Sequence, residues 1–294
     1  MGAEGGEHSR PHGHDQLLET AQQTLSDVGS SVRVQAGTLL VQRGESERGR
    51  AIGLEGIDLA RRIASPYSEA NALNQYTWLL VHDRDPQAAA HWAQQLVAQS
   101  NERGYLFLAL LGSFLLAWAE ASCIPASAAE DEASRQSLED AIGRMRQSFE
   151  LARAADAAMG TSGWIGAMVE VYLQHGRVDE AQDLIEQARV HIEATGEDLY
   201  LAEHLRLRGE VAIAVEGAKP QEAEPFFDQA IQVARRQGTR TYELRAASQL
   251  ARLWADQGER DRARELLADC RAQFGEDASS SAVKEAEGLL AALF

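Results

Sequence analysis

Three glycines recur at a fixed interval in the C-terminal half of the chain. Gly176, Gly217 and Gly258 are each 41 residues apart, and each follows a segment in which apolar residues have helical spacing. A glycine ends a helix easily because it adopts the left-handed backbone conformation without steric cost. A constant interval of this length is typical of stacked repeats of one supersecondary unit. The interval therefore predicts an array of repeated helical units.

The unit is clearest in residues 241–270, which predict two amphipathic helices joined at Gly258. Before this glycine, apolar residues recur at intervals of three and four and so share one helical face: Leu244, Ala247, Leu250, Ala251 and Trp254. After it, Ala263, Leu267 and Cys270 follow at intervals of four and three. Such a pair cannot bury its apolar faces alone, so it requires neighbours on both sides.

Similar units can be placed from residue 31 onward, and together they predict an all-α fold. We expect about six antiparallel helix pairs, arranged as an α-solenoid in a right-handed superhelix. Residues 15–294 form one repeat domain in this interpretation, with a helix over 15–28 before the first pair and a capping helix around Val283 to Leu293. Residues 1–14 are rich in glycine and polar residues and predict a disordered tail.

The first unit carries glycines where the other units carry larger residues. Gly49, Gly53 and Gly56 take the positions of Ala263, Leu267 and Cys270, and a glycine inside a helix costs about 1 kcal/mol relative to alanine. Two explanations stay open from the sequence: very close packing of the two helices, or a mobile first unit.

The segment 105–119 is apolar on every helical face. It must be covered all round or form an interface, so we expect either the following insertion, residues 122–134, or a second copy of the chain to cover it. A homodimer through residues 105–119 is one form of the second alternative. The insertion is long enough to be a lid or a docking strap, and equally a solvated surface loop. As a membrane span the segment is short, and a buried helix fits it better.

Net charge and cysteine content limit the kinds of partner and the cellular location that we expect. The formal net charge is −17, which repels nucleic acid and anionic lipid surfaces, so we expect neither as a partner. Of the 28 basic residues only Lys219 and Lys284 are lysines, and interleaved arginine and glutamate favour ion-paired helix faces. Cys123 and Cys270 match no metal-ligand spacing. Together with the lack of an apolar signal-peptide core, they favour a cytoplasmic location.

The C-terminal part of the chain resembles a known family. The segments RLRGE (206–210), AIQVARRQG (230–238), ELRAASQLARLWADQGERDRARELL (243–267) and VKEAEGLL (283–290) carry the resemblance. They resemble the C-terminal tetratricopeptide repeats of bacterial multidomain signalling ATPases, some of which also carry an adenylate cyclase or a helix-turn-helix regulator domain. The resemblance is strong from about Thr161 onward and looser from about Ser31.

The same resemblance implies a regulatory or sensing role without catalysis. No G-x-x-x-x-G-K-[ST] phosphate-binding loop is present, and no pattern of cyclase metal-binding carboxylates can be placed. No nucleophile–base–acid set stands out either, because His175, His191 and His204 lie on helices beside charged residues. His8, His12 and His14 lie in the predicted tail and would hold a metal only weakly. We therefore expect no enzyme activity, no cofactor and no metal.

The best candidate site is the concave surface of the superhelix, which the first helix of each pair should line. Counting back from the turns places ten residues there: Asn71, Asn74, Trp78, His82, Glu203, Arg206, Glu210, Arg245, Arg252 and Asp256. Amides, an aromatic ring and arginines suit the backbone and carboxylates of an extended peptide. Alternatively, these charged residues pair with one another and Trp78 belongs to the core. If the surface binds a peptide, Arg206, Arg245 and Arg252 form an exposed positive strip on it.

Two functions remain from the sequence. The first is a scaffold or adaptor that binds a segment of a partner protein in the concave groove, in bacterial signalling or regulation. The second is a ligand-sensing domain that gates a separate ATPase, cyclase or transcription regulator. An open groove would favour the first, and a closed apolar pocket beneath residues 122–134 would favour the second.

Overall fold

The computed structural model describes residues 28–127, 131–155, 160–217, 219–276 and 278–293, and within them it is entirely helical. No strand forms in these ranges. The predicted all-α class is therefore confirmed. The predicted tail over 1–14 and most of the helix over 15–28 lie outside the described residues.

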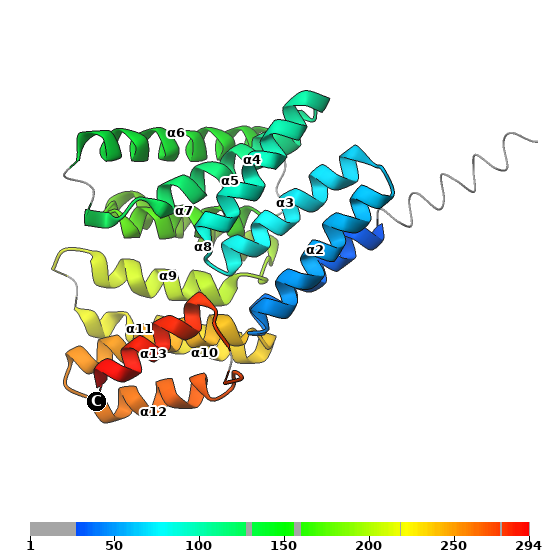
Figure 1. Ribbon diagram of the computed structural model, residues 1–294. Coiled ribbons are helices and arrows are strands. Elements are labelled where there is room, and N and C mark those ends of the chain that lie inside the picture. Colours follow the sequence, from blue (N-terminus) through cyan, green and yellow to red (C-terminus); the bar gives the residue numbers. More distant parts are fainter. Residues whose placement is uncertain (1–27, 128–130, 156–159, 218, 277, 294) are drawn as a thin grey trace, which may run out of the picture.

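Within the described ranges, consecutive helices form six pairs followed by a single last helix (Figure 1). The first pair joins the helical residues 28–42 to α2 (Ser46–Arg62). The remaining helices are α3 (Pro66–His82) with α4 (Pro86–Arg103), α5 (Leu106–Cys123) with α6 (Glu132–Ala154), α7 (Thr161–Gln174) with α8 (Val178–Thr195), α9 (Leu201–Ala214) with α10 (Glu224–Gln237), α11 (Arg240–Asp256) with α12 (Arg260–Arg271), and α13 (Ser281–Leu293). Pro220–Glu222 form a short 3-10 turn before α10.

The turns within the pairs follow the predicted chemistry. Gly176, Gly217 and Gly258 all have positive φ, at 70°, 76° and 88°. In the second pair, Arg84 has a φ of 54° at the corresponding place in the turn. Ala64 has the same φ of 54° between α2 and α3, so the helix-end turn itself, with its hydrogen bond from the N–H of Asp85 to the carbonyl oxygen of Leu80, accounts for this conformation.

The glycines of the first pair are explained by close packing. A Cβ atom on Gly49 would lie 2.5 Å from the carbonyl oxygen of Gly37, and one on Gly53 would lie 2.7 Å from the ring of Tyr76. A Cβ on Gly56 would lie 2.6 Å from Val34. Any side chain at these positions would push the helices apart.

The apolar helix α5 is covered mainly by its neighbours in the array. It packs against α4 and α6 on its sides and against α3 and α7 across the interior. By length and composition α5 could cross a membrane, but eight of its residues are buried among these helices. Exposed apolar side chains remain at its beginning, where Leu106 is 83 % exposed. The insertion after α5 is shorter than predicted, because α5 continues to Cys123 and α6 already begins at Glu132.

The array closes on itself, which the sequence did not predict. Thr241 Oγ1 on α11 donates a hydrogen bond to the carbonyl oxygen of Val41, 2.6 Å away. Ser279, before α13, donates to Glu47 on α2 at 3.3 Å. Figure 1 shows the lower end of the first pair reaching α10 to α13. The first pair therefore contacts the sixth, and the helices enclose an interior.

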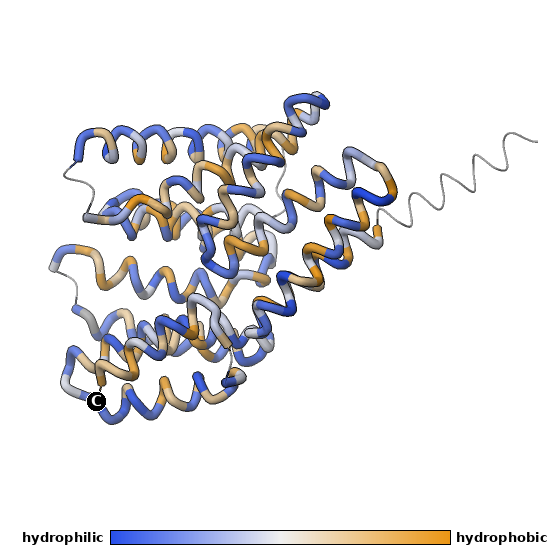
Figure 2. The backbone as a smooth tube through the Cα atoms, viewed as in Figure 1, coloured by the Kyte–Doolittle hydropathy of each residue, from blue (hydrophilic) through white to orange (hydrophobic). Residues whose placement is uncertain are grey.

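Apolar residues lie between the helices in two clusters. One runs from Val34 to Val211, and the other from Ala202 to Leu293. Helix α9 joins them, since Leu207 belongs to the first and Leu205 to the second. Figure 2 shows hydrophobic and hydrophilic residues alternating along most helices, whereas α5 is hydrophobic over most of its length.

Candidate functional site

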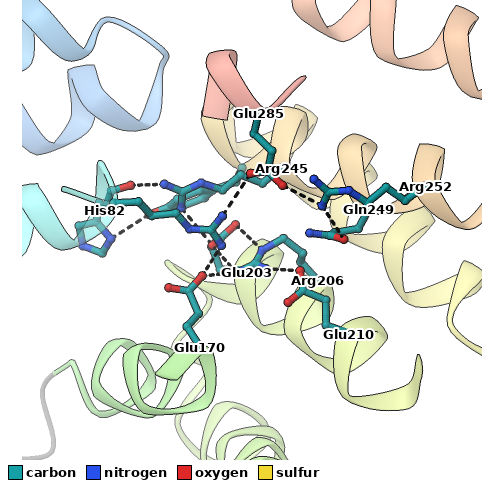
Figure 3. Close-up of polar contacts among 11 residues, drawn as sticks. His82, Glu170, Glu203, Arg206, Glu210, Arg245, Gln249, Arg252 and Glu285 are labelled. Carbon is teal, nitrogen blue, oxygen red and sulfur yellow. Dashed lines mark hydrogen bonds and ion pairs between the residues drawn. The ribbon is translucent and has the colours of Figure 1, made fainter. Parts of the chain in front are cut away.

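The interior holds a network of ion pairs that we call the arginine network. Its members are Arg84, Arg206, Arg245, Arg252, Glu170, Glu203, Glu210 and Glu285 (Figure 3). They come from the α3–α4 turn and from α7, α9, α11 and α13. Five segments that are distant in the sequence therefore meet at this point.

Arg206 is the centre of the network and is only 1 % exposed. Its guanidinium group contacts Glu170 at 2.5 Å, Glu210 at 2.5 Å and Glu203 at 3.0 Å. Burial acts to lower the pKa of Arg206, but the three carboxylates raise it well above its usual value. The group therefore stays charged in the interior.

Arg245 is also enclosed, at 4 % exposure. It contacts Glu203 at 3.2 Å, and its Nη2 donates a hydrogen bond to the backbone carbonyl of His82. Burial acts to raise the pKa of Glu203, but Arg206, Arg245 and Arg84 lower it to about 2. The expectation that Arg206 and Arg245 form an exposed strip is wrong. The neighbouring helices enclose both, and glutamates neutralise them.

Arg84 and Arg252 complete the network on its more open side. Arg84 forms ion pairs with Glu170 and, at 3.7 Å, with Glu285. Arg252 contacts Glu285 at 2.8 Å and Gln249 at 3.2 Å, and its side chain is 42 % exposed.

His82 connects this network to a chain of hydroxyl groups. Burial and the nearby Arg245 lower the pKa of His82 to about 4, so the ring is neutral. Its Nδ1 lies 3.3 Å from the hydroxyl of Tyr242, and its Nε2 lies 3.2 Å from that of Tyr200. Gln42 donates to the Tyr242 hydroxyl. The neutral imidazole donates through one ring nitrogen and accepts through the other, so it links the two tyrosine hydroxyls.

On the other side of His82 lies a cavity of about 1170 Å³, which we call the amide-lined cavity. Its apolar lining comes from four helices and the α8–α9 connection: Leu39, Trp78, Phe107, Leu111, Trp164, Leu199 and Tyr200. Trp78 stacks on Phe114, with ring centroids 5.9 Å apart. Its polar lining includes five carboxamides: Gln35, Gln42, Asn71, Asn74 and Gln75.

Two of these carboxamides have unused acceptors. The Oδ1 atom of Asn74 and the Oε1 atom of Gln75 are buried without a hydrogen-bond partner among the described residues. The nitrogens of Asn71 and Gln75 both donate to the hydroxyl of Ser31, at 3.2 and 3.3 Å. A buried acceptor without a partner costs about 1–3 kcal/mol. A ligand with N–H or O–H donors would remove this cost.

The residues expected on the concave surface fall into two groups. Asn71, Asn74, Trp78 and His82 line the amide-lined cavity together. Glu203, Arg206, Glu210, Arg245 and Arg252 belong to the arginine network. Asp256 belongs to neither and lies exposed at the end of α11. Trp78 combines both interpretations made from the sequence, since it packs on the core and also faces the cavity.

The sequence analysis missed several residues of both groups. Glu170 lies six residues before Gly176, as Arg252 lies six before Gly258, so the same count extended to α7 would have found it. Arg84 stands at a turn position that glycine takes in other units, which was a usable signal. Gln35 and Gln42 had no signal, because they face the cavity only through the closure of the array.

The three histidines expected on helices have structural contacts, although His175 lies in the turn just after α7. His204 is buried, its pKa is lowered to about 4 mainly by burial, and its Nε2 lies 2.8 Å from the carbonyl oxygen of Ser162. His191 lies 2.9 Å from Glu197, and His175 lies 3.1 Å from the carbonyl oxygen of Ala121. The described residues contain no cluster of three or more side chains suited to a metal. His8, His12 and His14 lie outside the described residues.

Comparison with known proteins gives little further information. No family model matches the chain, and no curated protein matches its sequence. Among solved structures, the chain is similar to one described as a circular tandem repeat protein with novel repeat topology and enhanced subunit contact surfaces. The identity is 13 %, the match covers 94 % of this chain and 84 % of that one, and the TM-score is 0.29. We base no argument on so loose a likeness.

Proposed function

We propose that this protein is a binding module that takes up a short, mainly apolar segment of a partner protein in the amide-lined cavity. In this proposal the helix pairs are tetratricopeptide-type repeats in a right-handed superhelix. The module acts as a scaffold or adaptor in signalling, as the resemblance to the repeats of signalling ATPases implies. The 41-residue interval of the turn glycines supports a repeated helix pair, and the small residues that follow each turn are the features that resemble tetratricopeptide repeats.

The observation that carries the proposal is the row of carboxamides on one wall of the cavity. A carboxamide offers a donor and an acceptor, as a peptide bond does, so it can bind an extended backbone without a charge. The unpartnered oxygens of Asn74 and Gln75 would accept from backbone N–H groups. The aromatic and leucine side chains opposite them would bury the apolar side chains of the segment.

Size and charge agree with a peptide. The volume of about 1170 Å³ exceeds the range usual for a small-molecule pocket, roughly 300–1,000 Å³. Among the lining residues the one carboxylate is Glu197, which is already bound to His191 and Ser162. A segment without charged side chains would thus leave no buried charge unpaired.

A random peptide library selected against the immobilised protein tests this proposal. We expect selected peptides to be rich in apolar residues and poor in charged ones, and to bind Asn74→Ala about tenfold more weakly in calorimetry. Asn101→Ala, on the exposed side of α4, is the matched control and should bind as the wild type does. Selected peptides that bind Asn74→Ala with full affinity would contradict the proposal.

A second candidate is a ligand-sensing domain that gates a separate ATPase, cyclase or transcription regulator. It is favoured by the double role of Gln42, His82 and Tyr200, which line the cavity and also belong to the chain of hydrogen bonds toward α11. A ligand that displaced these side chains would act on the contact between the first and sixth pairs. Hydrogen exchange in residues 28–62 should then change when the cavity is filled.

A further inference from the structure

A second cavity, of about 440 Å³, lies on the other face of the arginine network. It is formed where the α3–α4 turn meets α5, α7, α9 and α11. Pro86, Trp118 and Leu173 supply its apolar lining, and Arg84, Glu170 and Glu210 are among its polar residues. The volume lies within the usual range for a small molecule, roughly 300–1,000 Å³. We call it the indole cavity.

The indole of Trp118 is the first sign of a ligand here. Trp118 is 3 % exposed, and its Nε1 is buried without a hydrogen-bond partner among the described residues. An indole N–H can only donate, and buried tryptophans usually find an acceptor. Because Trp118 lines the cavity, an acceptor atom bound there is a candidate for the missing partner, and water or a ligand hydroxyl would both serve.

The carboxylates beside it have unused acceptor capacity. Glu210 is bound to Arg206 through Oε1, and Glu170 accepts from Arg84 and Arg206 through its own Oε1. A carboxylate offers about four acceptor positions over its two oxygens. Hydroxyl groups could donate to the remaining positions without breaking any ion pair of the network.

The charge balance of the network excludes most charged ligands. The four arginines and the four glutamates cancel formally, and each arginine already contacts at least one glutamate. A net charge added beside them would be largely buried and would have no counter-ion. A carboxylate would also have to displace Glu170 or Glu285 from Arg84. A neutral ligand adds no unpaired charge and leaves the ion pairs of Arg84 in place.

We propose that the indole cavity binds a small, neutral, polyhydroxylated molecule. One hydroxyl oxygen accepts from Trp118 Nε1, and other hydroxyls donate to Glu170 and Glu210. The hydrocarbon face of the ligand packs on Pro86, Leu173 and the indole ring. This site is separate from the amide-lined cavity and does not depend on the peptide proposal.

Nuclear magnetic resonance of the indole N–H groups tests the proposal directly. The probes are D-glucose and myo-inositol as neutral polyols, with L-glutamate and L-arginine as charged molecules of similar size. Each is added up to about 10 mM, enough to detect a dissociation constant of about 1 mM. The Trp118 resonance is assigned by its loss in Trp118→Phe, a variant that keeps an aromatic ring and removes the donor.

We expect a neutral polyol to shift the Trp118 resonance and to leave that of Trp92, which packs on Tyr76 away from this cavity, unchanged. Trp118→Phe should bind the polyol about tenfold more weakly in calorimetry, whereas Trp92→Phe should bind it normally. Asn74→Ala should also bind it normally, which separates this site from the peptide site.

Three results would overturn the proposal. One is the absence of any shift with either polyol. Another is an equal or larger shift with L-glutamate or L-arginine, which would assign the cavity to charged ligands. The third is unchanged polyol affinity in Trp118→Phe, which would place the polyol elsewhere on the protein.

Discussion

The carboxamide of Gln42 donates a hydrogen bond to the hydroxyl of Tyr242, which lies 3.0 Å away and 200 residues later in the chain. The same hydroxyl lies 3.3 Å from His82, so one atom of α11 joins the first helix pair to the second. Both Gln42 and Tyr242 are buried. This hydrogen bond is part of the contact that closes the array.

The first prediction concerns this closure. Tyr242→Phe removes the hydroxyl and leaves Gln42 and His82 with a lost partner, so we expect a loss of about 1–3 kcal/mol in the free energy of unfolding. Hydrogen exchange should rise in residues 28–62 more than in α7 and α8. Tyr67→Phe, at an exposed tyrosine, is the control. Equal protection of residues 28–62 in both variants would show that the closure does not depend on the hydrogen bonds of this hydroxyl.

The second prediction concerns the centre of the arginine network. Arg206→Ala leaves Glu170, Glu203 and Glu210 close together without their shared counter-ion, and we expect a loss of about 3–5 kcal/mol. The matched control is Arg189→Ala, since Arg189 pairs with Glu186 and Glu193 on the surface of α8, where solvent screens the pairs and their loss should barely change stability. Chemical denaturation measures both. Similar losses for the two variants would mean that burial adds little to the network.

The third prediction concerns pH. Burial lowers the pKa of His82 and of His204 from 6.5 to about 4, so the folded protein keeps both neutral where the unfolded chain protonates them. The unfolded state binds more protons in this window, so stability falls as the pH drops from 6.5 to 4 and is unaffected above it. At pH 5 each histidine should account for about 2 kcal/mol.

His204→Asn tests this assignment. The drop in melting temperature between about pH 7 and about pH 5 should be smaller in this variant than in the wild type, because one linked proton is gone. His91→Asn, at an exposed histidine on α4, should keep the full drop. A variant His204→Asn with the wild-type pH dependence would remove His204 as a source of the effect.

The fourth prediction compares two glycine-to-alanine substitutions inside helices. In Gly49→Ala the new methyl group would lie 2.5 Å from the carbonyl oxygen of Gly37, so the first pair must separate, at a cost of about 1–3 kcal/mol. Gly143 on α6 has nothing within 4 Å of the same position, so Gly143→Ala should stabilise the protein by about 0.5–1 kcal/mol. Opposite shifts in melting temperature are therefore expected. Stabilisation by Gly49→Ala would contradict the close approach of the two helices.

Local features were predicted well because they depend on neighbouring residues alone. Gly176, Gly217 and Gly258 were found from spacing, and all three have the positive φ expected at a helix end. The boundaries moved by a few residues, as with the insertion predicted over 122–134, which is shortened because α6 begins at Glu132. Asp131 explains this, because its side chain accepts a hydrogen bond from the N–H of Ser134 and caps the helix.

The environment of the site was beyond such reasoning. Helical spacing placed Arg206 and Arg245 on one face correctly, but it could not show that Glu170 and the His82 carbonyl lie opposite them. Those contacts depend on how far each pair rotates relative to the one before. Small rotations add up along the array, and only their sum brings Gln42 to Tyr242. The accumulated rotation cannot be predicted from the sequence of any one unit.

The closure of the array has a consequence for how such a chain can change its length. An open array of helix pairs tolerates the gain or loss of a unit, because each unit touches only its neighbours. Here an extra unit of 41 residues between α8 and α9 would carry α11 past residue 42, and a missing unit would leave a gap between them. The curvature of the array therefore fixes the number of repeats, as the circumference of a ring fixes the number of its segments.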